Sequence, residues 1–405
     1  MMWKKEFSSE QGKSFDYVLA ALGVFVITGV IFNNRSAFIG VGMFIAFLIA
    51  YKIYDRSMEK KIALHNQATT IKLFPGEEAI LRFELQNSSI FPMLNGKLNL
   101  RIGSAVNAYT MTEDPINYWK ELKISLSIFQ KKATAIQFPV IAEQRGVSKI
   151  TNISLELPHF LSFHLITLKY NPSYQTEFIV FPKLLPVRGV EIISQIVPGS
   201  ARLNLSPFED IQSPLGTREY NYSDPFYRIN WNASVKSQTL QTNVYEKVVD
   251  KSFVFIVNIG SEDNVNMAKF NENLENLLSY TAYLCEYATK SGVSYEIYMN
   301  ARKSGKVPYV HFPEGGGKTH YGHTLEMLAR IHKQSLIVPF NEMIHRLGKQ
   351  FASPKTMIVI GDVPTGAMQI MDRWKRSQKT VYHVVEAKDG AVVRPLVKEA
   401  MMDAN

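Results

Sequence analysis

The chain has 405 residues, more than one hydrophobic core usually supports, so we expect two folded domains besides any anchor. Hydrophobic residues make up 46% and charged residues 20% of it, proportions that exclude a disordered protein and a polytopic transporter. The formal net charge of +9 points to an anionic partner, either lipid head groups or nucleic acid. The single cysteine, Cys285, excludes an intramolecular disulfide framework and a multi-cysteine zinc site.

Two apolar segments near the N-terminus predict a transmembrane hairpin. They cover 17–32 and 37–54, and Arg35 in the polar turn between them is the only charge from Tyr17 to Tyr51. Neither segment has the polar stripe of a helix buried in a soluble core, and each is near the length that crosses a bilayer. A cleaved signal peptide fits poorly because a second apolar segment follows. We therefore expect residues 1–61 to form an N-terminal tail and this hairpin.

Basic residues flank the hairpin at both ends, whereas its turn carries Arg35 alone. The flanking residues are Lys4, Lys5, Lys13, Lys52, Arg56, Lys60 and Lys61. The positive-inside rule then predicts a multi-pass protein of the plasma membrane whose soluble body faces the cytoplasm. The lipid bilayer is accordingly the favoured anionic partner. No nucleic acid is expected as a partner, because no recognisable binding motif accompanies the charge.

Two patterns divide the soluble body. Apolar and polar residues alternate with a period of two, between turn residues, at 69–73, 79–85, 97–102, 135–140 and 150–155. Short strands at this spacing predict an antiparallel β-sandwich over 65–185. After residue 250, apolar strands (252–259, 293–299, 356–360 and 380–386) alternate with helices (267–290, 321–332 and 339–349). This alternation predicts an α/β doubly wound domain with a parallel sheet over 251–405.

The segment 186–250 links these two domains and contains the most unusual stretch of the sequence. It contains Arg218, Glu219, Tyr220, Asp224, Arg228, Ile229, Trp231, Ala233 and Leu240. This pattern resembles the signature of the bacterial domain of unknown function 58 family, with Ser223 where the family usually has glycine. Arg145-Gly146 and Val180-Phe181-Pro182 resemble lesser landmarks of that family.

The resemblance covers most of the chain, including the anchor. It implies a membrane-tethered protein with a von Willebrand factor A-like domain at its C-terminus. It also implies that the protein is associated with a MoxR-type AAA ATPase and with transglutaminase-like proteins.

The signature residues allow two interpretations. Arg218, Glu219, Tyr220, Asp224 and Arg228 near Trp231 suit a buried or half-buried ion-pair network in which a guanidinium stacks on the indole. Such a network can be an interdomain clasp, which is the commoner use of paired charges beside aromatic rings. It can also be a docking surface for a protein partner, with Arg228 and Trp231 as the main binding residues. Both interpretations stay open.

A metal-binding A domain places Asp-x-Ser-x-Ser after its first strand, where the oxygen atoms bind a divalent ion. Here Asn258, Gly260 and Glu262 occupy those positions, so the site is degenerate and no metal is expected. Asp263 and Asp362, near predicted strand ends, keep a cation-dependent adhesion module open as a further possibility.

The run Gly315-Gly316-Gly317-Lys318-Thr319 ends like a Walker A loop, which makes a membrane-bound NTPase the alternative function. Phe312, however, stands where such a loop needs its first glycine. No catalytic constellation is recognisable, and the histidines at 311, 320, 323 and 332 lack metal-ligand spacing. The favoured prediction is a non-enzymatic, cofactor-free scaffold that works with a MoxR-type AAA ATPase in assembly or maturation of a membrane or envelope complex.

Overall fold

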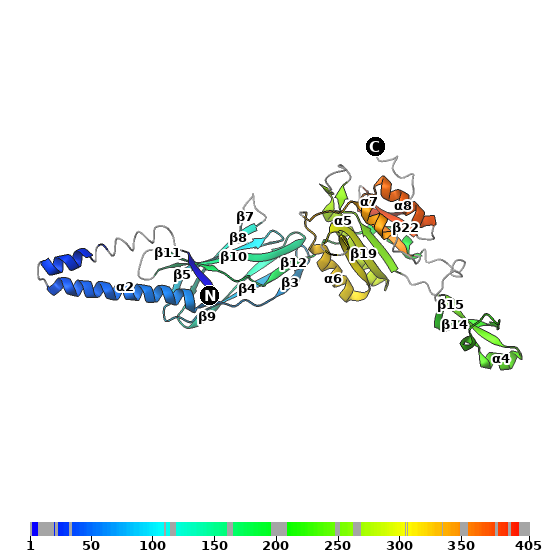
Figure 1. Cartoon of the computed structure of the whole chain (residues 1–405), viewed down its shortest axis with the longest axis horizontal. Helices are drawn as coiled ribbons and strands as arrows, with labels where there is room; N and C mark the ends of the chain where they lie inside the picture. Colours follow the sequence, from blue (N-terminus) through cyan, green and yellow to red (C-terminus); the bar gives the residue numbers. More distant parts are fainter. Residues whose placement is uncertain are drawn as a thin grey trace. The chain divides into compact units, whose positions relative to one another are not determined.

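The computed structural model describes residues 2–6, 20, 23–31, 35–108, 111–113, 119–159, 165–195, 209–247, 252–261, 269–303, 305, 307–333, 335–348, 355–376, 380–387 and 390–396. The chain is multidomain, as the sequence predicts (Figure 1). It divides into two compact units. Unit 1 is Met1–Lys183 with Leu325–His332, and unit 2 is Leu184–Thr324 with Lys333–Asn405.

Unit 1 is a β-sandwich. Its strands are β1 (Trp3–Glu6), β2 (Ile62–Leu64), β3 (Thr70–Leu73), β4 (Glu78–Asn87), β5 (Met93–Gly103), β6 (Val106–Asn107), β7 (Met111–Glu113), β8 (Trp119–Ile128), β9 (Lys132–Ala142), β10 (Gly146–Pro158), β11 (Leu165–Tyr170) and β12 (Glu177–Val180). One sheet has the order β1-β11-β10-β5-β8-β7, with β12 pairing β10 and β3, and the other is β2-β4-β9-β6. The alternation that predicts these strands directs Leu81 and Phe83 of one sheet and Leu98 of the other into a shared core.

The strand β1 lies before the apolar segments, in the part of the sequence that we expected to be a tail. It pairs antiparallel with β11, from Trp3 opposite Tyr170 to Glu6 opposite Thr167. The Trp3 side chain is fully buried and packs edge-on against Tyr170, with ring centroids 5.2 Å apart. The chain is therefore part of the sandwich before it enters the apolar segments.

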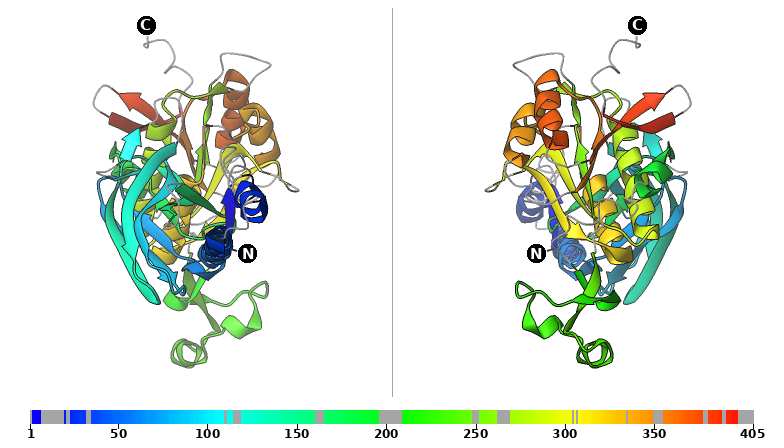
Figure 2. Two further views of the ribbon diagram at one scale, coloured as in Figure 1. Left: turned by 90° about the vertical axis from the view of Figure 1, so that its left-hand side faces the viewer. Right: turned by 90° about the vertical axis from the view of Figure 1, so that its right-hand side faces the viewer.

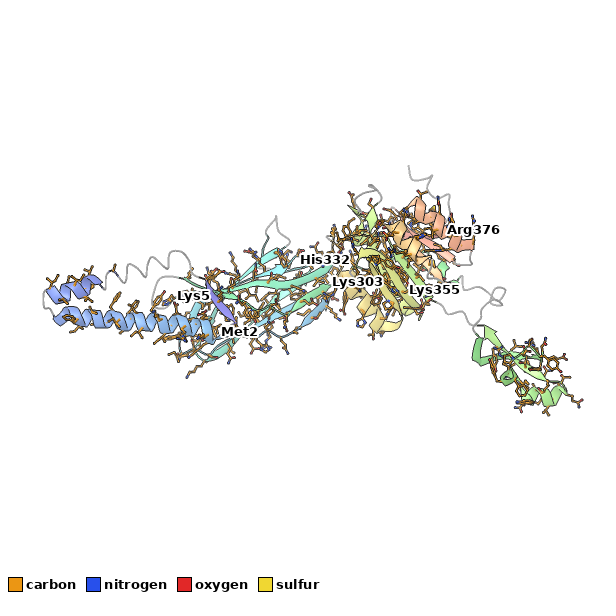
Figure 3. All side chains as sticks on the ribbon, in the orientation of Figure 1. Met2, Lys5, Lys303, His332, Lys355 and Arg376 are labelled. Atoms are coloured by element: carbon orange, nitrogen blue, oxygen red, sulfur yellow. The ribbon has the colours of Figure 1, made fainter. Side chains whose placement is uncertain are left out.

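One helix among the described residues is long and apolar enough to cross a bilayer. It is α2 (Arg35–Lys61), in which an 18-residue window of the stretch Phe38–Lys61 has a mean hydropathy of 1.6. Side chains such as Ile39 and Met43 are more than 60% exposed. Figure 3 shows side chains projecting from α2 on several sides. This helix contains all of the predicted span 37–54 and begins within the predicted turn. Of the predicted span 17–32, residues 23–31 are helical and most of the others lie outside the described part, so the second span stays a prediction.

The base of α2 is embedded in the sandwich. Tyr54 and Met58 are buried in the same core as the strands. Asp55 accepts a 2.5 Å hydrogen bond from Lys5 Nζ of β1, and its carboxylate lies 3.5 Å from Nε2 of the buried His159. The His159 ring also packs against Tyr54, with centroids 4.6 Å apart. One helical turn thus joins the strand before the apolar segments to the domain after them.

Unit 2 contains a mixed α/β sheet. Its strands are β13 (Val187–Arg188), β16 (Ser252–Val257), β19 (Ser294–Arg302), β20 (Tyr309–Gly315), β21 (Thr356–Ile360), β22 (Thr380–Ala387) and β23 (Gly390–Pro395). The order is β13-β23-β22-β21-β16-β19-β20. The central strands β19, β16, β21 and β22 are mutually parallel. The edge strand β20 pairs antiparallel with β19, and β23 pairs antiparallel with β22 but parallel with β13. The helices are α3 (Val190–Gln195), α5 (Leu274–Lys290), α6 (Gly317–Ala329), α7 (Phe340–Leu347) and α8 (Thr365–Arg376).

Helices cover both faces of this sheet (Figure 2). Val254 and Ile256 of β16 share a buried cluster with residues of α7 and α8, among them Met343 and Met371. Because strand side chains alternate, Phe255 points to the other face, where α5 contacts β16 and β19. Burial on both faces explains why these strands are continuous apolar runs rather than alternating ones.

Replacing Trp3 with alanine should lower the free energy of unfolding of the sandwich by about 3–5 kcal/mol, because it removes a fully buried indole. Denaturant unfolding of the full chain in detergent micelles measures the loss. Trp119→Ala is the matched control, since that side chain is 40% exposed and should cost less than about 1 kcal/mol. Equal effects of the two substitutions would contradict the structural role of β1.

Candidate functional site

The signature residues lie in a small module of unit 2, which we call the signature module (residues 209–247). Its frame is an antiparallel ribbon of β14 (Glu209–Glu219) and β15 (Gln241–Lys247). Between the two strands the chain forms the short helices η2 (Phe226–Arg228) and α4 (Trp231–Ser237). A ribbon of only two strands is marginally stable in water unless other side chains pack against it. The contacts around the ribbon therefore determine whether the module is stable by itself or depends on a partner.

Arg218 and Asp224 form a two-pronged ion pair that closes the turn after β14. Arg218 Nη1 and Nη2 donate to the two carboxylate oxygens of Asp224 at 2.8 and 2.6 Å. The backbone N–H of Asn221 donates to the same carboxylate at 3.0 Å, and the Tyr220 hydroxyl donates to the Asp224 carbonyl at 3.1 Å. The Arg218 hydrogen bonds, followed by that of Asn221, lower the pKa of Asp224. The side chains of Arg218 and Asp224 are 52% and 13% exposed, so the pair lies at the surface of the module.

A second set of hydrogen bonds fixes the start of α4. The Asn230 side chain caps the helix by accepting from the Ala233 N–H at 3.0 Å. The Ser234 hydroxyl donates to the Asn230 carbonyl at 2.7 Å and accepts from the Gln241 N–H at 2.8 Å, which joins the helix to β15. These bonds hold Trp231 at the first position of α4, with its indole edge-on to Phe226 at 5.9 Å between centroids.

The Arg228 guanidinium lies 5.9 Å from the ring centroids of Tyr227 and Tyr245. The sequence interpretation named an indole as the stacking surface, and here two tyrosine rings flank the cation. Glu219, the remaining signature residue, is exposed at the end of β14, opposite Gln241.

Most large apolar side chains of the module face outward. The exposed fractions are Tyr222 99%, Val235 80%, Tyr227 76%, Phe226 70%, Trp231 57% and Leu240 48%. Of the side chains described in the module, Ile229, Ser234 and Thr242 are the buried ones. A folded segment with so small a core and so much exposed aromatic surface is typical of an interaction site. We call Tyr222, Phe226, Tyr227, Trp231, Val235 and Leu240 the aromatic face.

The sequence interpretation singled out Trp231 and missed the rest of the aromatic face. The available signal was the density of aromatic residues between 220 and 231 without the spacing of a buried strand or helix. Such a run has no core face to occupy, which is a reason to expect it on the surface.

The degenerate metal position holds a closed network of amides. Asn258, which follows β16, is 2% exposed, and its side-chain oxygen accepts from the Gly260 N–H at 3.0 Å and from Asn300 Nδ2 at 2.8 Å. Its Nδ2 donates to the Asp362 carbonyl at 2.7 Å. Both lone pairs of the Asn258 side-chain oxygen are therefore used within the protein, which leaves none for a cation. Glu262 and Asp263 lie outside the described residues. Within the described part, no three His, Cys, Asp or Glu residues are grouped to hold a metal.

The glycine-rich run has too little backbone between strand and helix to enclose a phosphate. The edge strand β20 pairs with β19 as far as Gly315, and α6 begins at Gly317, so Gly316 alone separates them. A side chain at Gly315 would collide with His320, whose Nδ1 lies 2.5 Å from the Cβ position. Packing of His320 therefore accounts for a glycine here. Lys318 and Thr319 lie in the first turn of α6.

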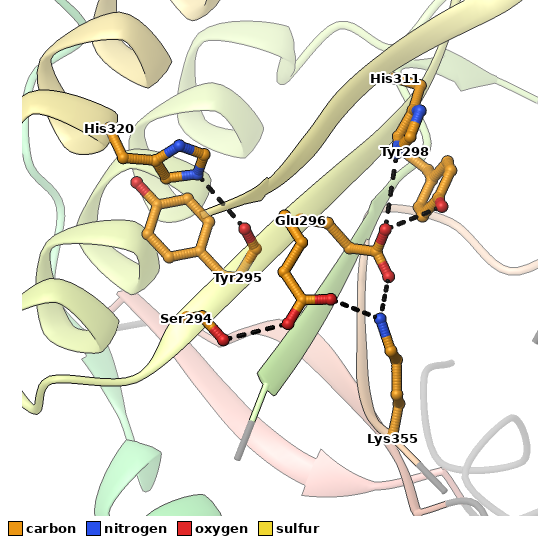
Figure 4. Close-up of polar contacts among 8 residues, drawn as sticks. Ser294, Tyr295, Glu296, Tyr298, His311, His320 and Lys355 are labelled. Carbon is orange, nitrogen blue, oxygen red and sulfur yellow. Dashed lines mark hydrogen bonds and ion pairs between the residues drawn. The ribbon is translucent and has the colours of Figure 1, made fainter. Parts of the chain in front are cut away.

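An ion cluster around the buried Glu296 in unit 2 was not expected from the sequence (Figure 4). Lys355 Nζ donates to Glu296 Oε1 at 2.7 Å and to Glu314 Oε2 at 2.8 Å. The Tyr298 hydroxyl donates to the other Glu296 oxygen at 2.8 Å, and the His311 ring stacks on Tyr298 with centroids 4.4 Å apart. The cluster lies towards the amino ends of the parallel strands, away from the edge where α/β sheets bind ligands. We therefore assign it to stability.

Cys285 is fully buried in α5, and desolvation raises the pKa of its thiol well above the ordinary value. A thiol kept protonated in this way is a weak nucleophile. This agrees with the structural role that its helical context predicts.

In unit 1, Arg145 Nη1 donates to the carbonyls of Leu328 at 2.8 Å and Ile331 at 2.6 Å. A guanidinium that satisfies the carbonyls at a helix end stabilises that end. Arg145 is one of the lesser landmarks of the family resemblance, and this contact gives it a structural role.

No protein-family model matches the sequence, and no curated protein matches it. Solved structures that are similar over parts of the chain include the following three. A Salmonella alpha-2-macroglobulin mutant is 13% identical over 30% of this chain and 7% of its own, with a TM-score of 0.21. The Pseudomonas fluorescens alkylpurine DNA glycosylase AlkC, bound to abasic-site DNA, is 12% identical over 30% of each chain, with a TM-score of 0.19. AvmM, which catalyses macrocyclisation in alchivemycin A biosynthesis, is 8% identical over 29% of this chain and 80% of its own, with a TM-score of 0.20. Overlaps this small support no argument about function.

Lys355→Met should destabilise unit 2 by about 3 kcal/mol, because it leaves the carboxylate of Glu296, 7% exposed, without its cation. Chemical unfolding of the full chain measures this. Lys290→Met is the control, since Lys290 is 72% exposed in an i,i+4 pair and should change stability by less than about 0.5 kcal/mol. A neutral Lys355→Met would contradict the assignment to stability.

The same variant should show a smaller acid-induced loss of stability. Hydrogen bonding from Lys355 lowers the pKa of Glu314 below its ordinary 4.5, although burial opposes this. A depressed carboxylate pKa contributes stability above the unfolded value, and this contribution is lost as pH falls through the folded value. Without Lys355 the depression is removed, so the stability curves of the two proteins should converge in acid.

Neither Mg²⁺ nor ATP should raise the melting temperature of the full chain, because the amide network and the short strand-to-helix connection lack the ligand geometry. Lys318→Ala should behave like the unsubstituted protein in the same titrations. A magnesium shift that EDTA reverses would support the cation-dependent module, and an ATP shift lost in Lys318→Ala would support the NTPase.

Proposed function

We propose that this chain is a non-enzymatic, membrane-anchored scaffold that binds a protein partner through the aromatic face of its signature module. The single observation that carries the proposal is the exposure of six large apolar side chains on a module in which only three of the described side chains are buried. The residues that contribute most to binding in protein interfaces are enriched in tryptophan, tyrosine and arginine, the types present on this face and beside it. The hydrogen bonds around Asn230 and the Arg218–Asp224 pair support this, because they pre-order the surface before binding.

The anchor that we propose is a hairpin of two transmembrane helices. Support comes from unit 1, where β1 and the base of α2 belong to one folded domain. The chain between Glu6 and Tyr54 must therefore begin and end on the same side of a bilayer. If α2 crosses once, a second crossing is required before Arg35, and 17–32 is the apolar segment available. The basic flanks favour a cytoplasmic body.

For the α/β domain we propose a von Willebrand factor A-like fold that binds proteins without a metal. Support comes from its parallel central strands, its antiparallel edge strand β20 and the amide network after β16. As partner we propose a MoxR-type AAA ATPase, which the family resemblance implies, in assembly or maturation of a membrane or envelope complex.

Trp231→Ala should weaken capture of a MoxR-type AAA ATPase of the same organism by roughly 30-fold, the equivalent of about 2 kcal/mol for a residue at the centre of an interface. The measurement is a pull-down with the full chain in detergent, with and without ATP. Trp119→Ala, an equally large change on the sandwich, is the matched control and should bind normally.

Two results would count against the proposal. Absence of ATPase capture in both nucleotide states would remove the proposed partner. Normal capture by Trp231→Ala together with a lowered melting temperature would favour the clasp interpretation, because a clasp residue stabilises the chain rather than the complex.

A further inference from the structure

Two loops with apolar side chains lie at the end of the sandwich where α2 joins it. Ile62, the first residue after α2, pairs with Asn87 at the end of β4, and Asn87 pairs with Lys132 at the start of β9. Met93 of β5 pairs with Ile128 of β8 at this same end. The connections 88–92 and 129–131 therefore lie beside the base of the apolar helix. We call residues 88–94 and 129–132 the loop rim.

Hydrogen bonds and a ring contact hold the loop rim in place against α2 and the strands. The buried Asn87 side chain donates to the Phe91 carbonyl at 2.9 Å, and the Lys131 N–H donates to the Ser89 carbonyl at 3.2 Å. The Ser88 N–H donates to the Lys61 carbonyl at 2.8 Å, and the Phe91 ring packs against Tyr54 with centroids 5.1 Å apart. Ser88 therefore lies beside Lys61, the last residue of α2, and Phe91 lies beside Tyr54, closer to the apolar part of the helix.

Helix geometry gives the position of Phe91 along the axis of α2. Tyr51 ends the uncharged stretch, and Tyr54 lies three residues further on, about 4.5 Å along the axis. Phe91, which contacts Tyr54, is thus at the level of the lipid head groups if α2 spans the bilayer. Side chains that extend beyond Phe91 towards Tyr51 reach the boundary with the acyl chains.

Apolar side chains are concentrated at this end. Six large apolar residues between 62 and 183 are strongly exposed, in the part of the sandwich that the structure describes: Ile80, Ile90, Leu94, Trp119, Phe129 and Leu165. Three of them, Ile90, Leu94 and Phe129, belong to the loop rim, and Leu165 begins β11 at the same end, opposite Pro158. Lys131 and Lys132 are exposed beside Phe129, and Lys60 and Lys61 are exposed at the end of α2.

We propose that the loop rim is a second membrane-binding surface, which inserts Ile90, Leu94 and Phe129 into the interface of a bilayer containing anionic phospholipid. This inference rests on the proposed anchor and extends it. Exposed apolar residues bordered by lysines suit the interface, where apolar tips enter the acyl boundary and lysines meet phosphates. Continuity with the apolar helix selects lipid over a protein as the occupant. The second contact would hold the sandwich in a fixed orientation to the membrane.

Depth-dependent fluorescence quenching tests the inference on the full chain in vesicles of equimolar phosphatidylcholine and phosphatidylglycerol. An environment-sensitive dye is attached to Ile90→Cys or Phe129→Cys, and spin-labelled lipids quench it; Cys285 can stay because it is fully buried. Ile80→Cys is the matched control, because Ile80 is also exposed but lies about 20 Å from Asn87 along β4. Ile45→Cys on α2 reports the anchor itself.

We expect head-group-labelled lipid to quench the dye at Ile90→Cys and Phe129→Cys but not at Ile80→Cys, while chain-labelled lipid quenches it at Ile45→Cys. Lys131→Glu with Lys132→Glu should reduce quenching at the rim, as should vesicles of phosphatidylcholine alone. Quenching at Ile45→Cys without quenching at the rim would overturn this inference and leave the anchor intact. No quenching at Ile45→Cys would overturn the anchor, and the inference with it.

Discussion

The return of the chain to one folded domain is the constraint on which the rest of the structure depends. Trp3, buried in β1, and Tyr54 and Met58, buried at the base of α2, belong to a single core although the whole apolar region separates them in sequence. Asp55 reinforces the junction through Lys5 and the neighbouring His159. Because the strand before the apolar region and the end of α2 after it are fixed in one core, the proposed anchor would be rigidly joined to the sandwich rather than attached by a flexible linker.

The fixed junction between α2 and the sandwich bears on the exposed apolar surfaces described above. In unit 1 the fixed base of α2 lies beside the exposed side chains of the loop rim, which we propose to bind lipid. Among the described residues, the signature module has four strongly exposed aromatic side chains, Tyr222, Phe226, Tyr227 and Trp231, and its turns are held by the Arg218–Asp224 pair and the Asn230 cap. The α/β unit instead shows closed polar networks around Asn258 and Glu296. The polar groups of both networks are satisfied within the protein, which suits a role in stability.

Sequence patterns predicted the elements whose signal is local. Period-two alternation gives β4, and the continuous apolar run 252–259 gives β16. The degenerate metal position is readable from Asn258 and Gly260 because a ligand set is defined by residue type and spacing. By contrast, β1 is four residues with two lysines, and its burial depends on β11, which is distant in sequence. The Glu296–Lys355 pair joins residues 59 positions apart, and the amide network joins Asn258 to Asn300, so neither has a sequence signature. The outward aromatic face likewise depends on how the ribbon and α4 fold.

The most direct test of the central claim is the sidedness of the turn between the two apolar segments. In intact cells, a membrane-impermeant maleimide should label Asn34→Cys, whereas Ile80→Cys on the sandwich should react only after permeabilisation. That pattern means that the chain leaves the cytoplasmic body, crosses the bilayer and returns. Labelling of both positions under the same condition would show that the apolar region does not cross, and the reverse pattern would place the body outside the cell.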